Sequence, residues 1–388
     1  MRHFFLYTLL VVLLISCRSE PSAPEPAPKA AAAASEAAPA ADNAEPGEAD
    51  AQPSAPETAA LPDEADVAQA DSPELESAAF SYLDDYSPLT EAQRAAFFAS
   101  PADPPADRLD AIKEEHVGAH FMWTDELHHE LFEPHIQGLG GGYVGIGTNQ
   151  AYLYLGWQRP HLAWLIDYDP WVVALHEAYF VFFKAANNAE ELLAFFEDGD
   201  AGKKILSNEL ATHPELSLIL TAYSKSRSGV KYNLLRQRNG LRKLEVKSFL
   251  TDQETFDFVR GLILAGRVRT LLGNLLDQTG VQGIGKSATE LGVPIRVLYL
   301  SNAEQYWNYT EQFKSNMLCL PFDEKTVVLR TSATKPVNKD YRYHVQAGDV
   351  FRAWLEHPKT TGVRNLAKRV RVDGPDHFPL VLDTERPE

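Results

Sequence analysis

The sequence predicts an α/β fold in which helices cover both faces of a mostly parallel β-sheet. Three observations support this prediction. Short apolar runs alternate with helix-compatible segments through most of the chain. A glycine-rich turn at residues 145–148 follows one of these runs directly, and Asp167 ends the next run. Parallel strands bring such a turn and such a carboxylate to the same edge of a sheet, which is where small molecules bind.

Residues 1–17 have the pattern of an export signal. Arg2 precedes an apolar run over residues 4–15, which is too short to span a membrane and has the length of a signal peptide's apolar core. The Leu-Ile-Ser that precedes Cys17 resembles the lipobox of bacterial lipoproteins, which implies cleavage before that cysteine and a lipid on it. We therefore expect a lipid-anchored protein of the cell envelope, and Arg18 in place of an aspartate favours the outer over the inner membrane. The alternative is a cytosolic protein with an apolar start.

Residues 18–80 are rich in alanine, proline and acidic residues. They hold 14 acidic and two basic residues, a net charge of −12 out of −18 for the chain. Such a segment cannot bury enough apolar surface to offset its ordering entropy, so we expect a disordered linker. Removing it and Arg2 leaves a net charge of −7 for residues 81–388. A mildly acidic domain is a poor candidate for nucleic-acid binding, which needs clustered positive charge.

Residues 81–388 are numerous enough for one large domain with an ample core. The chain has two cysteines, and Cys17 is the expected lipid carrier, so we expect no internal disulfide. Cys319 lies in an apolar run and is better explained as a core residue than as a nucleophile. The stability of the domain should therefore come from packing.

Two helices are expected at the start of the domain, at residues 82–98 and 107–133. The second would place His116 and His120 four residues apart on one face, a spacing that suits two zinc ligands. The segment lacks the H-E-x-x-H pattern, and the sequence fixes no third ligand. We therefore predict no metal site and interpret the segment as a solvated helix whose histidines titrate near neutral pH.

Residues 143–146 and 162–166 are expected to be neighbouring strands joined by a helix. The first strand runs into the glycine turn, where Gly145 and Gly147 would let the backbone approach a ligand. Asp167 follows Gly147 by twenty residues, the spacing at which a carboxylate accepts hydrogen bonds from a ribose diol. The alternative is that the glycines only allow a tight turn and that Asp167 only caps the next helix.

A helical insertion is expected at about residues 171–250. Its first part is dense in aromatic residues, as expected of a helix packed on a sheet. A later basic cluster consists of Lys225, Arg227, Lys231, Arg236, Arg238, Arg242 and Lys243. This cluster either attracts an anion at the ligand-binding edge or forms the exposed side of a helix.

The alternation of strands and helices continues to the end of the domain. Strands are expected at residues 268–272, 295–300, 325–331 and 341–345, with helices at 252–266, 284–291 and 347–355. The first two of these strands run into polar residues that should converge on the edge used by Asp167. The candidate pocket residues are Asn274, Ser301, Asn302, Glu304 and Tyr306. The alternative for Ser301 and Asn302 is a role in capping the next helix.

These motifs together resemble a known family. Val144-Gly145-Ile146-Gly147-Thr148 followed by Leu165-Ile166-Asp167 resembles the class I S-adenosylmethionine-dependent methyltransferase superfamily, in layout over about residues 138–330. The resemblance implies a Rossmann-like domain in which the glycine turn meets the cofactor and Asp167 holds its ribose. Residues 301–306 also resemble a pattern in an uncharacterised bacterial group with this fold, which implies no activity.

Two functions therefore remain open. The first is methyl transfer from S-adenosylmethionine to an unknown acceptor, with Gly145, Gly147, Asn149 and Asp167 holding the cofactor and the candidate pocket residues lining the acceptor site; no catalytic residue is indicated. The second, which we favour, is a methyltransferase-like domain that serves as a surface-tethered binding or scaffold protein with a nucleoside-type pocket. The expected export favours the second function, because S-adenosylmethionine is not expected outside the cytoplasm. A nicotinamide oxidoreductase comes third, because the third glycine of G-x-G-x-x-G is missing.

Overall fold

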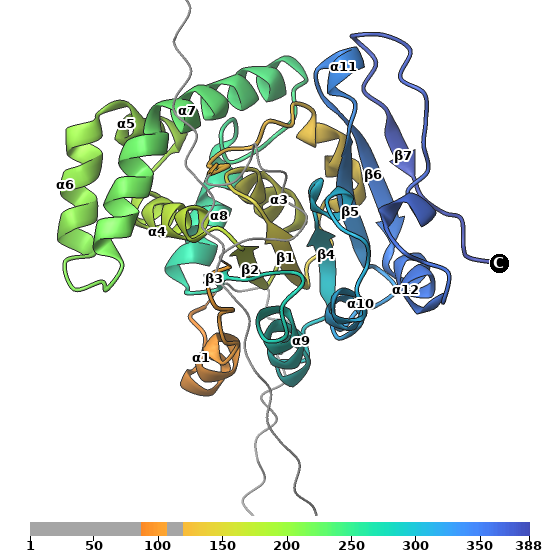
Figure 1. The fold of residues 1–388 in the computed structure, drawn as a ribbon. Helices are drawn as coiled ribbons and strands as arrows, with labels where there is room; N and C mark the ends of the chain where they lie inside the picture. Colours follow the sequence, from red (N-terminus) through yellow and green to blue (C-terminus); the bar gives the residue numbers. More distant parts are fainter. Residues whose placement is uncertain (1–86, 107–118) are drawn as a thin grey trace, which may run out of the picture. The chain divides into compact units, whose positions relative to one another are not determined.

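The computed structural model describes residues 87–106 and 119–388 (Figure 1). The expected export signal with Cys17, the acidic segment at residues 18–80, and His116 lie outside the described residues. The chain divides into two units, residues 1–71 and 72–388, and the fold described here belongs to the second. Within the described ranges, no helix is both long and apolar enough to cross a membrane.

One seven-stranded sheet forms the centre of the described part of the chain, in the order β3-β2-β1-β4-β5-β6-β7. Its strands are β1 (Gly142–Ile146), β2 (Leu162–Asp167), β3 (Val268–Leu272), β4 (Ile295–Tyr299), β5 (Val327–Ala333), β6 (Tyr341–Ala347) and β7 (Leu380–Leu382). Strands β1 to β5 are parallel, β6 runs antiparallel to β5, and β7 is parallel to β6. The predicted α/β class with a mostly parallel sheet is confirmed. The reversed direction of β6 and the short strand β7 are not predicted by the sequence.

Helices cover both faces of this sheet. One face packs against α3 (Gln150–Gln158), α4 (Pro170–Ala185), α7 (Leu216–Lys243) and α8 (Gln253–Leu264). The other packs against α1 (Glu91–Phe98), α9 (Gly280–Glu290), α10 (Glu311–Leu318) and α12 (Gly348–Glu356). Side chains alternate along each strand, so Tyr143 enters the first core and Val144 the second.

Between β2 and α8, the helices α4, α5 (Ala189–Glu197), α6 (Gly199–Glu209) and α7 pack together beside the sheet (Figure 1). Residues 171–250, expected to be a helical insertion, contain these helices. Capping residues define the starts of three of them, Asp169 for α4, Asn188 for α5 and Asp198 for α6. The basic cluster lies mainly on α7, where Arg238 and Arg242 pair with Glu190. Part of its charge is therefore matched within the insertion.

The segment at residues 119–128 differs from its prediction, because it is not helical. The Thr124 N–H donates to Asn149 Oδ1 (3.2 Å), and the Leu127 N–H donates to Asp340 Oδ1 (3.0 Å). Contacts with distant parts of the chain thus replace the hydrogen bonds that a helix would make. Short helical turns follow at η2 (His129–Phe132) and α2 (Glu133–Ile136). The expected first helix is shorter than predicted, since α1 begins only after the capping residue Thr90.

Hydrogen bonds hold the first described residue, Ser87, against the sheet. Arg267, which is buried just before β3, donates from Nε and Nη2 to the Ser87 carbonyl at 2.9 and 2.8 Å. After α1, Asp103 is buried against the loop between β3 and α9. The remaining short elements are η3 (Ala303–Gln305), α11 (Lys335–Asn338) and η4 (Val363–Asn365).

Candidate functional site

A pocket of about 270 Å³ opens at the carboxyl ends of the parallel strands. It lies at the end of β1, where the strand order reverses: the chain runs outward from β1 to β2 and β3, then crosses back to β4 on the other side of β1. Open parallel sheets bind ligands at this position. Residues that follow four strands contribute to it, Gly147 after β1, Asp167 at the end of β2, Asn274 after β3 and Ser301 after β4. Its remaining lining residues include Trp123, Asp125, Gln150, Tyr168, Asp169, Asn302, Tyr306, Lys335 and Tyr341.

The glycine turn after β1 is held by its neighbours. Gly147 has a φ of +91°, and an added Cβ would lie 2.2 Å from Gln150 Nε2. His176 Nε2 donates to the Gly147 carbonyl (2.9 Å), while its Nδ1 contacts the Tyr152 hydroxyl (2.9 Å). Burial lowers the pKa of His176 to about 4, so the ring is neutral at physiological pH and acts as a fixed donor.

At the start of α3, the position that usually receives a phosphate is already filled. The Thr148 N–H donates to the side-chain Oε1 of Gln150 (3.1 Å), which folds back over the turn. Anion binding at a helix start depends on free N–H groups. This end of α3 is therefore poorly suited to a pyrophosphate.

Asp167 joins the ends of β1 and β2. Its Oδ2 accepts the Gly147 N–H (3.1 Å), and its Oδ1 accepts the Asp169 N–H (2.9 Å). Burial raises the pKa of this carboxyl to about 7, against the opposing effect of the hydrogen bond from Asp169. A ligand that donates hydrogen bonds to Asp167 would favour its charged form.

Beside it, Asp169 engages His120. His120 Nδ1 lies 2.8 Å from Asp169 Oδ2, and the imidazole stacks on Trp171 with ring centroids 4.1 Å apart. Asp169 also caps α4 by accepting the Trp171 N–H. Across the described ranges, no group of three or more histidine, cysteine or acidic side chains is arranged to hold a metal ion.

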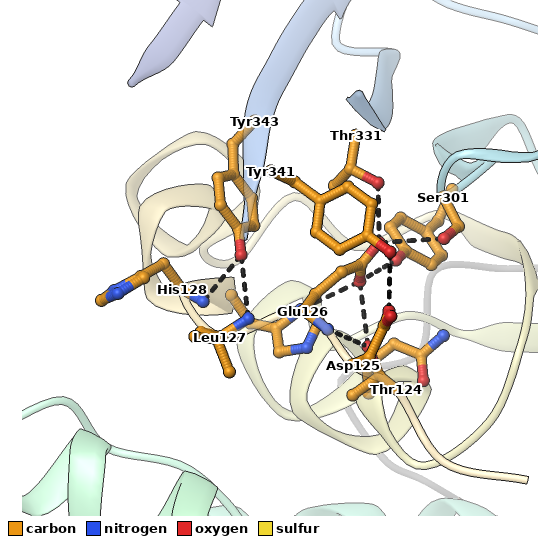
Figure 2. A network of polar contacts seen from close by, with 12 residues as sticks. Thr124, Asp125, Glu126, Leu127, His128, Ser301, Thr331, Tyr341 and Tyr343 are labelled. Carbon is orange, nitrogen blue, oxygen red and sulfur yellow. Dashed lines mark hydrogen bonds and ion pairs between the residues drawn. The ribbon is translucent and has the colours of Figure 1, made fainter. Parts of the chain in front are cut away.

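On the side of the pocket formed by Ser301, a buried carboxylate supports the lining. Glu126 accepts hydrogen bonds from the hydroxyls of Ser301 (2.9 Å) and Thr331 (2.7 Å), which lie after β4 and within β5 (Figure 2). It also accepts the hydroxyl of Tyr299 (2.5 Å), the last residue of β4. Burial raises the pKa of Glu126, and these hydroxyls oppose the rise. Ser301 adopts a positive φ of 48°, so this network fixes a backbone turn that lines the pocket.

Acidic and aromatic side chains dominate the pocket. Asp125 accepts the Tyr341 hydroxyl (2.8 Å; Figure 2) and pairs with Lys335, whose ammonium lies 5.2 Å from the Tyr341 ring centroid. Three acidic residues, Asp125, Asp167 and Asp169, thus face one basic residue among the described lining residues. At the rim, the exposed large side chains are Phe121, Trp123 and Tyr306.

Sequence comparison identifies the family of this chain. A family model described as a domain of unknown function, DUF7790, matches residues 121–377. The chain belongs to the DUF7790 family. The matched residues include the lining segments from Phe121 to Tyr341. No curated protein matches the sequence significantly.

In this DUF7790 domain, six of the nine predicted binding or pocket residues line the pocket together. They are Gly147, Asp167, Asn274, Ser301, Asn302 and Tyr306. Each lies at or after the carboxyl end of a parallel strand, as the predicted topology requires. Asn274 also accepts the Leu276 N–H (3.0 Å) with its own side chain, so it shapes the loop after β3.

Gly145, Asn149 and Glu304 lie outside the pocket lining, contrary to expectation. A Cβ on Gly145 would lie 2.1 Å from the Tyr143 hydroxyl, so this glycine makes room for the Tyr143 ring. Asn149 is buried, and its Nδ2 donates to Asn233 (2.8 Å) and Gln237 (3.0 Å) on α7.

Glu304 is the third of these residues. It is buried in an ion pair with Arg330, with 2.6 Å between Glu304 Oε2 and Arg330 Nε. It also accepts the Tyr309 hydroxyl. Its carboxylate is therefore committed to the packing of the domain.

The other acidic wall of the DUF7790 pocket is not predicted by the sequence. Asp125 and Glu126 fall in a segment predicted to be a solvated helix. Lys335 and Tyr341 flank the reversal between β5 and β6, which no sequence motif marks. The aromatic and acidic composition of residues 121–126, Phe-Met-Trp-Thr-Asp-Glu, was the one available signal.

Proposed function

We propose that this DUF7790 domain binds a nucleoside-type small molecule that carries a positive charge. The observation that carries the proposal is the position of Asp167, which ends β2 and accepts the N–H of the glycine turn after β1. A carboxylate at this point is suited to accept hydrogen bonds from a ribose diol. The aromatic side chains of the pocket offer flat apolar surfaces for a base.

The charge of the pocket supports a cationic ligand over a phosphorylated one. Asp169, together with Asp167 in its charged form, would repel a pyrophosphate, while Asp125 is paired with Lys335 and the start of α3 is closed by Gln150. Carboxylates next to aromatic faces favour sulfonium or ammonium groups. The same features argue against a nicotinamide dinucleotide and against nucleic acid.

The function favoured here is binding within the cell envelope, with the domain attached through a lipid on Cys17 and acting as a binding or scaffold protein. The apolar run before Cys17 and the acidic segment at residues 18–80 support this proposal from the sequence. Lipid attachment would place the domain at a membrane surface without spanning it. The outer membrane is favoured by Arg18.

Methyl transfer from S-adenosylmethionine is the second candidate. It is favoured by the strand order β3-β2-β1-β4-β5, which Rossmann-like domains share, together with the acidic pocket. Asp167 would hold the ribose of S-adenosylmethionine, and the aromatic and acidic side chains fit its adenine and its positive charges. When bound, it would supply an activated methyl group. The pocket residues would contribute alignment of an acceptor, which is the main requirement of such a transfer.

Ligand binding tests both candidates. The full chain is screened by thermal shift against S-adenosylmethionine, its demethylated product, adenosine and a nicotinamide dinucleotide. A ligand present at roughly a hundred times its Kd adds about 2.7 kcal/mol of stability. We expect S-adenosylmethionine and its demethylated product, which carry an ammonium group, to raise the melting temperature more than neutral adenosine does, and the dinucleotide not to raise it. A shift with the dinucleotide alone would contradict the charge argument, and no shift with any nucleoside would overturn the proposal.

Titration calorimetry of Asp167→Ala then tests the residue that carries the proposal. We expect the variant to lose roughly 1.5–3 kcal/mol of binding free energy for each hydrogen bond to the ribose. Asp198→Ala is the matched control, because Asp198 also accepts two backbone N–H groups but caps α6, away from the pocket lining. Equal affinity for the wild type and Asp167→Ala would show that Asp167 does not hold the ligand.

A further inference from the structure

A serine, a histidine and an aspartate form a hydrogen-bonded chain on the face of the sheet that packs against α12. Ser332 Oγ lies 2.8 Å from His344 Nε2, and His344 Nδ1 lies 3.0 Å from Asp383 Oδ2. Because Asp383 accepts at Nδ1, that nitrogen carries the proton and Nε2 is left to accept the serine hydroxyl. This is the arrangement that prepares a serine for nucleophilic attack.

Strand register brings the three residues together. Arg330 pairs with His344 across β5 and β6, so Ser332, two residues further along β5, lies diagonally next to the histidine on the same face. His344 pairs with Val381 of β7, and Asp383 follows two residues later. The neighbouring Thr331 points to the other face, toward Glu126. The triad is thus separate from the pocket and independent of the proposed function.

The surroundings suit a general base. His344 and Asp383 have side chains only 1% exposed, whereas Ser332 is less buried than either. The second oxygen of Asp383 accepts the Lys368 N–H (2.8 Å), which fixes the carboxylate. Arg330, two residues before Ser332 in β5, is buried in its ion pair with Glu304, and its Nη2 has no hydrogen-bond partner among the described residues.

We propose that Ser332, His344 and Asp383 form a second site that accepts acyl groups from small carboxylic esters. Ser332 Oγ attacks the ester carbonyl carbon while its proton moves to His344 Nε2, and the carbonyl electron pair moves onto oxygen. Collapse of this adduct expels the alcohol, which takes the proton from Nε2, and leaves the acyl group on Ser332. Water then attacks the acyl group with the same proton transfers and releases the acid.

A fluorophosphonate probe tests the nucleophile. The full chain is incubated with the probe, and the adduct is located by peptide mass spectrometry. We expect the adduct on Ser332, its loss in Ser332→Ala, and a rate lowered by roughly 100-fold or more in Asp383→Asn. Ser224→Ala is the control, because Ser224 is an exposed serine whose hydroxyl only donates to the Leu220 carbonyl. No adduct, an adduct on another serine, or an unchanged rate in folded Asp383→Asn would overturn the proposal.

A thiol variant gives a second readout that does not require the aspartate to be changed. In Ser332→Cys, His344 should favour the thiolate and make the cysteine react with iodoacetamide at neutral pH. Cys319 is the internal reference, because burial raises its pKa to about 11. Peptide mass spectrometry compares the two rates. Alkylation of Cys319 at an equal or higher rate would contradict an activating role for His344, even where Asp383→Asn fails to fold.

Discussion

Asp167 connects the chemistry of the pocket to the stability of the protein. Its pKa is raised from 3.8 to about 7 in the folded protein, so the folded state binds a proton more tightly than the unfolded state. The resulting stability is fully present below about pH 3.8 and is lost as the pH rises to about 7. The folded protein thus disfavours the charged form of Asp167, as is common for ionisable residues at binding sites.

Asp167→Asn isolates this effect. As the pH rises from about 4 to about 7, the wild type should lose stability relative to the variant. Above that range, the difference between their free energies of unfolding should stay constant. The shift should total less than ~4 kcal/mol, because solvent screens a partly exposed carboxylate. Urea denaturation at several pH values measures it. A difference that does not change with pH would show that Asp167 titrates normally in the folded protein.

Gly145 and Gly147 show how one motif can hold two different roles. Gly147 has the positive φ and the pocket position that the motif predicts. Gly145, two residues earlier, instead leaves space for Tyr143 on the same face of β1. The sequence alone does not distinguish the roles of the two glycines. The packing of Tyr143 against Gly145 does.

Among the elements, the loop from β3 to α9 depends on a residue from outside it. Asp103 accepts N–H groups from Asn274 (2.9 Å), Thr279 (3.2 Å) and Gly280 (2.7 Å). It therefore caps α9 from another part of the chain while holding Asn274 at the pocket wall. Buried carboxylates that accept several N–H groups are costly to remove, because the donors lose their partner.

We expect Asp103→Ala to lower the free energy of unfolding by roughly 2–4 kcal/mol, since three backbone donors would be left without their acceptor. Chemical denaturation measures the change. Asp198→Ala, which removes an exposed cap from α6, should cost only about 1 kcal/mol. Equal effects of the two substitutions would mean that the loop after β3 keeps its structure without Asp103.

The sequence predicts the parallel strands well, because each contains a short apolar run and is followed by a turn or loop with glycine or polar residues. This pattern also places Asp167, Asn274 and Ser301 at one edge. It fails for residues 119–128, whose conformation depends on Asn149 and Asp340, far away along the chain. The acidic wall with Asp125 was missed for the same reason, since the aromatic and acidic composition of residues 121–126 does not indicate where this segment packs.

For the whole molecule, the attachment to a membrane remains a prediction. If Cys17 carries the lipid, Cys17→Ser should leave the protein unprocessed or released from membranes, because the acceptor of the lipid is gone. Membrane fractionation and mass spectrometry of the mature N-terminus measure this. Ser16→Ala is a suitable control, since it keeps the cysteine and a small residue before it. A mature N-terminus at another residue, without lipid, would contradict the anchor.

The two hydrogen bonds from Arg267 to the Ser87 carbonyl have a mechanical consequence if a membrane anchor holds the protein. If Cys17 carries the lipid, a pull from the membrane would enter the described part of the chain at Ser87, whose carbonyl accepts two hydrogen bonds from a buried arginine. Along the chain, α1 and Asp103 lie between Ser87 and the segment that carries Asp125. The edge of the sheet at β3 would therefore take part of such a load before it reached Asp103, the residue that holds Asn274 at the pocket wall.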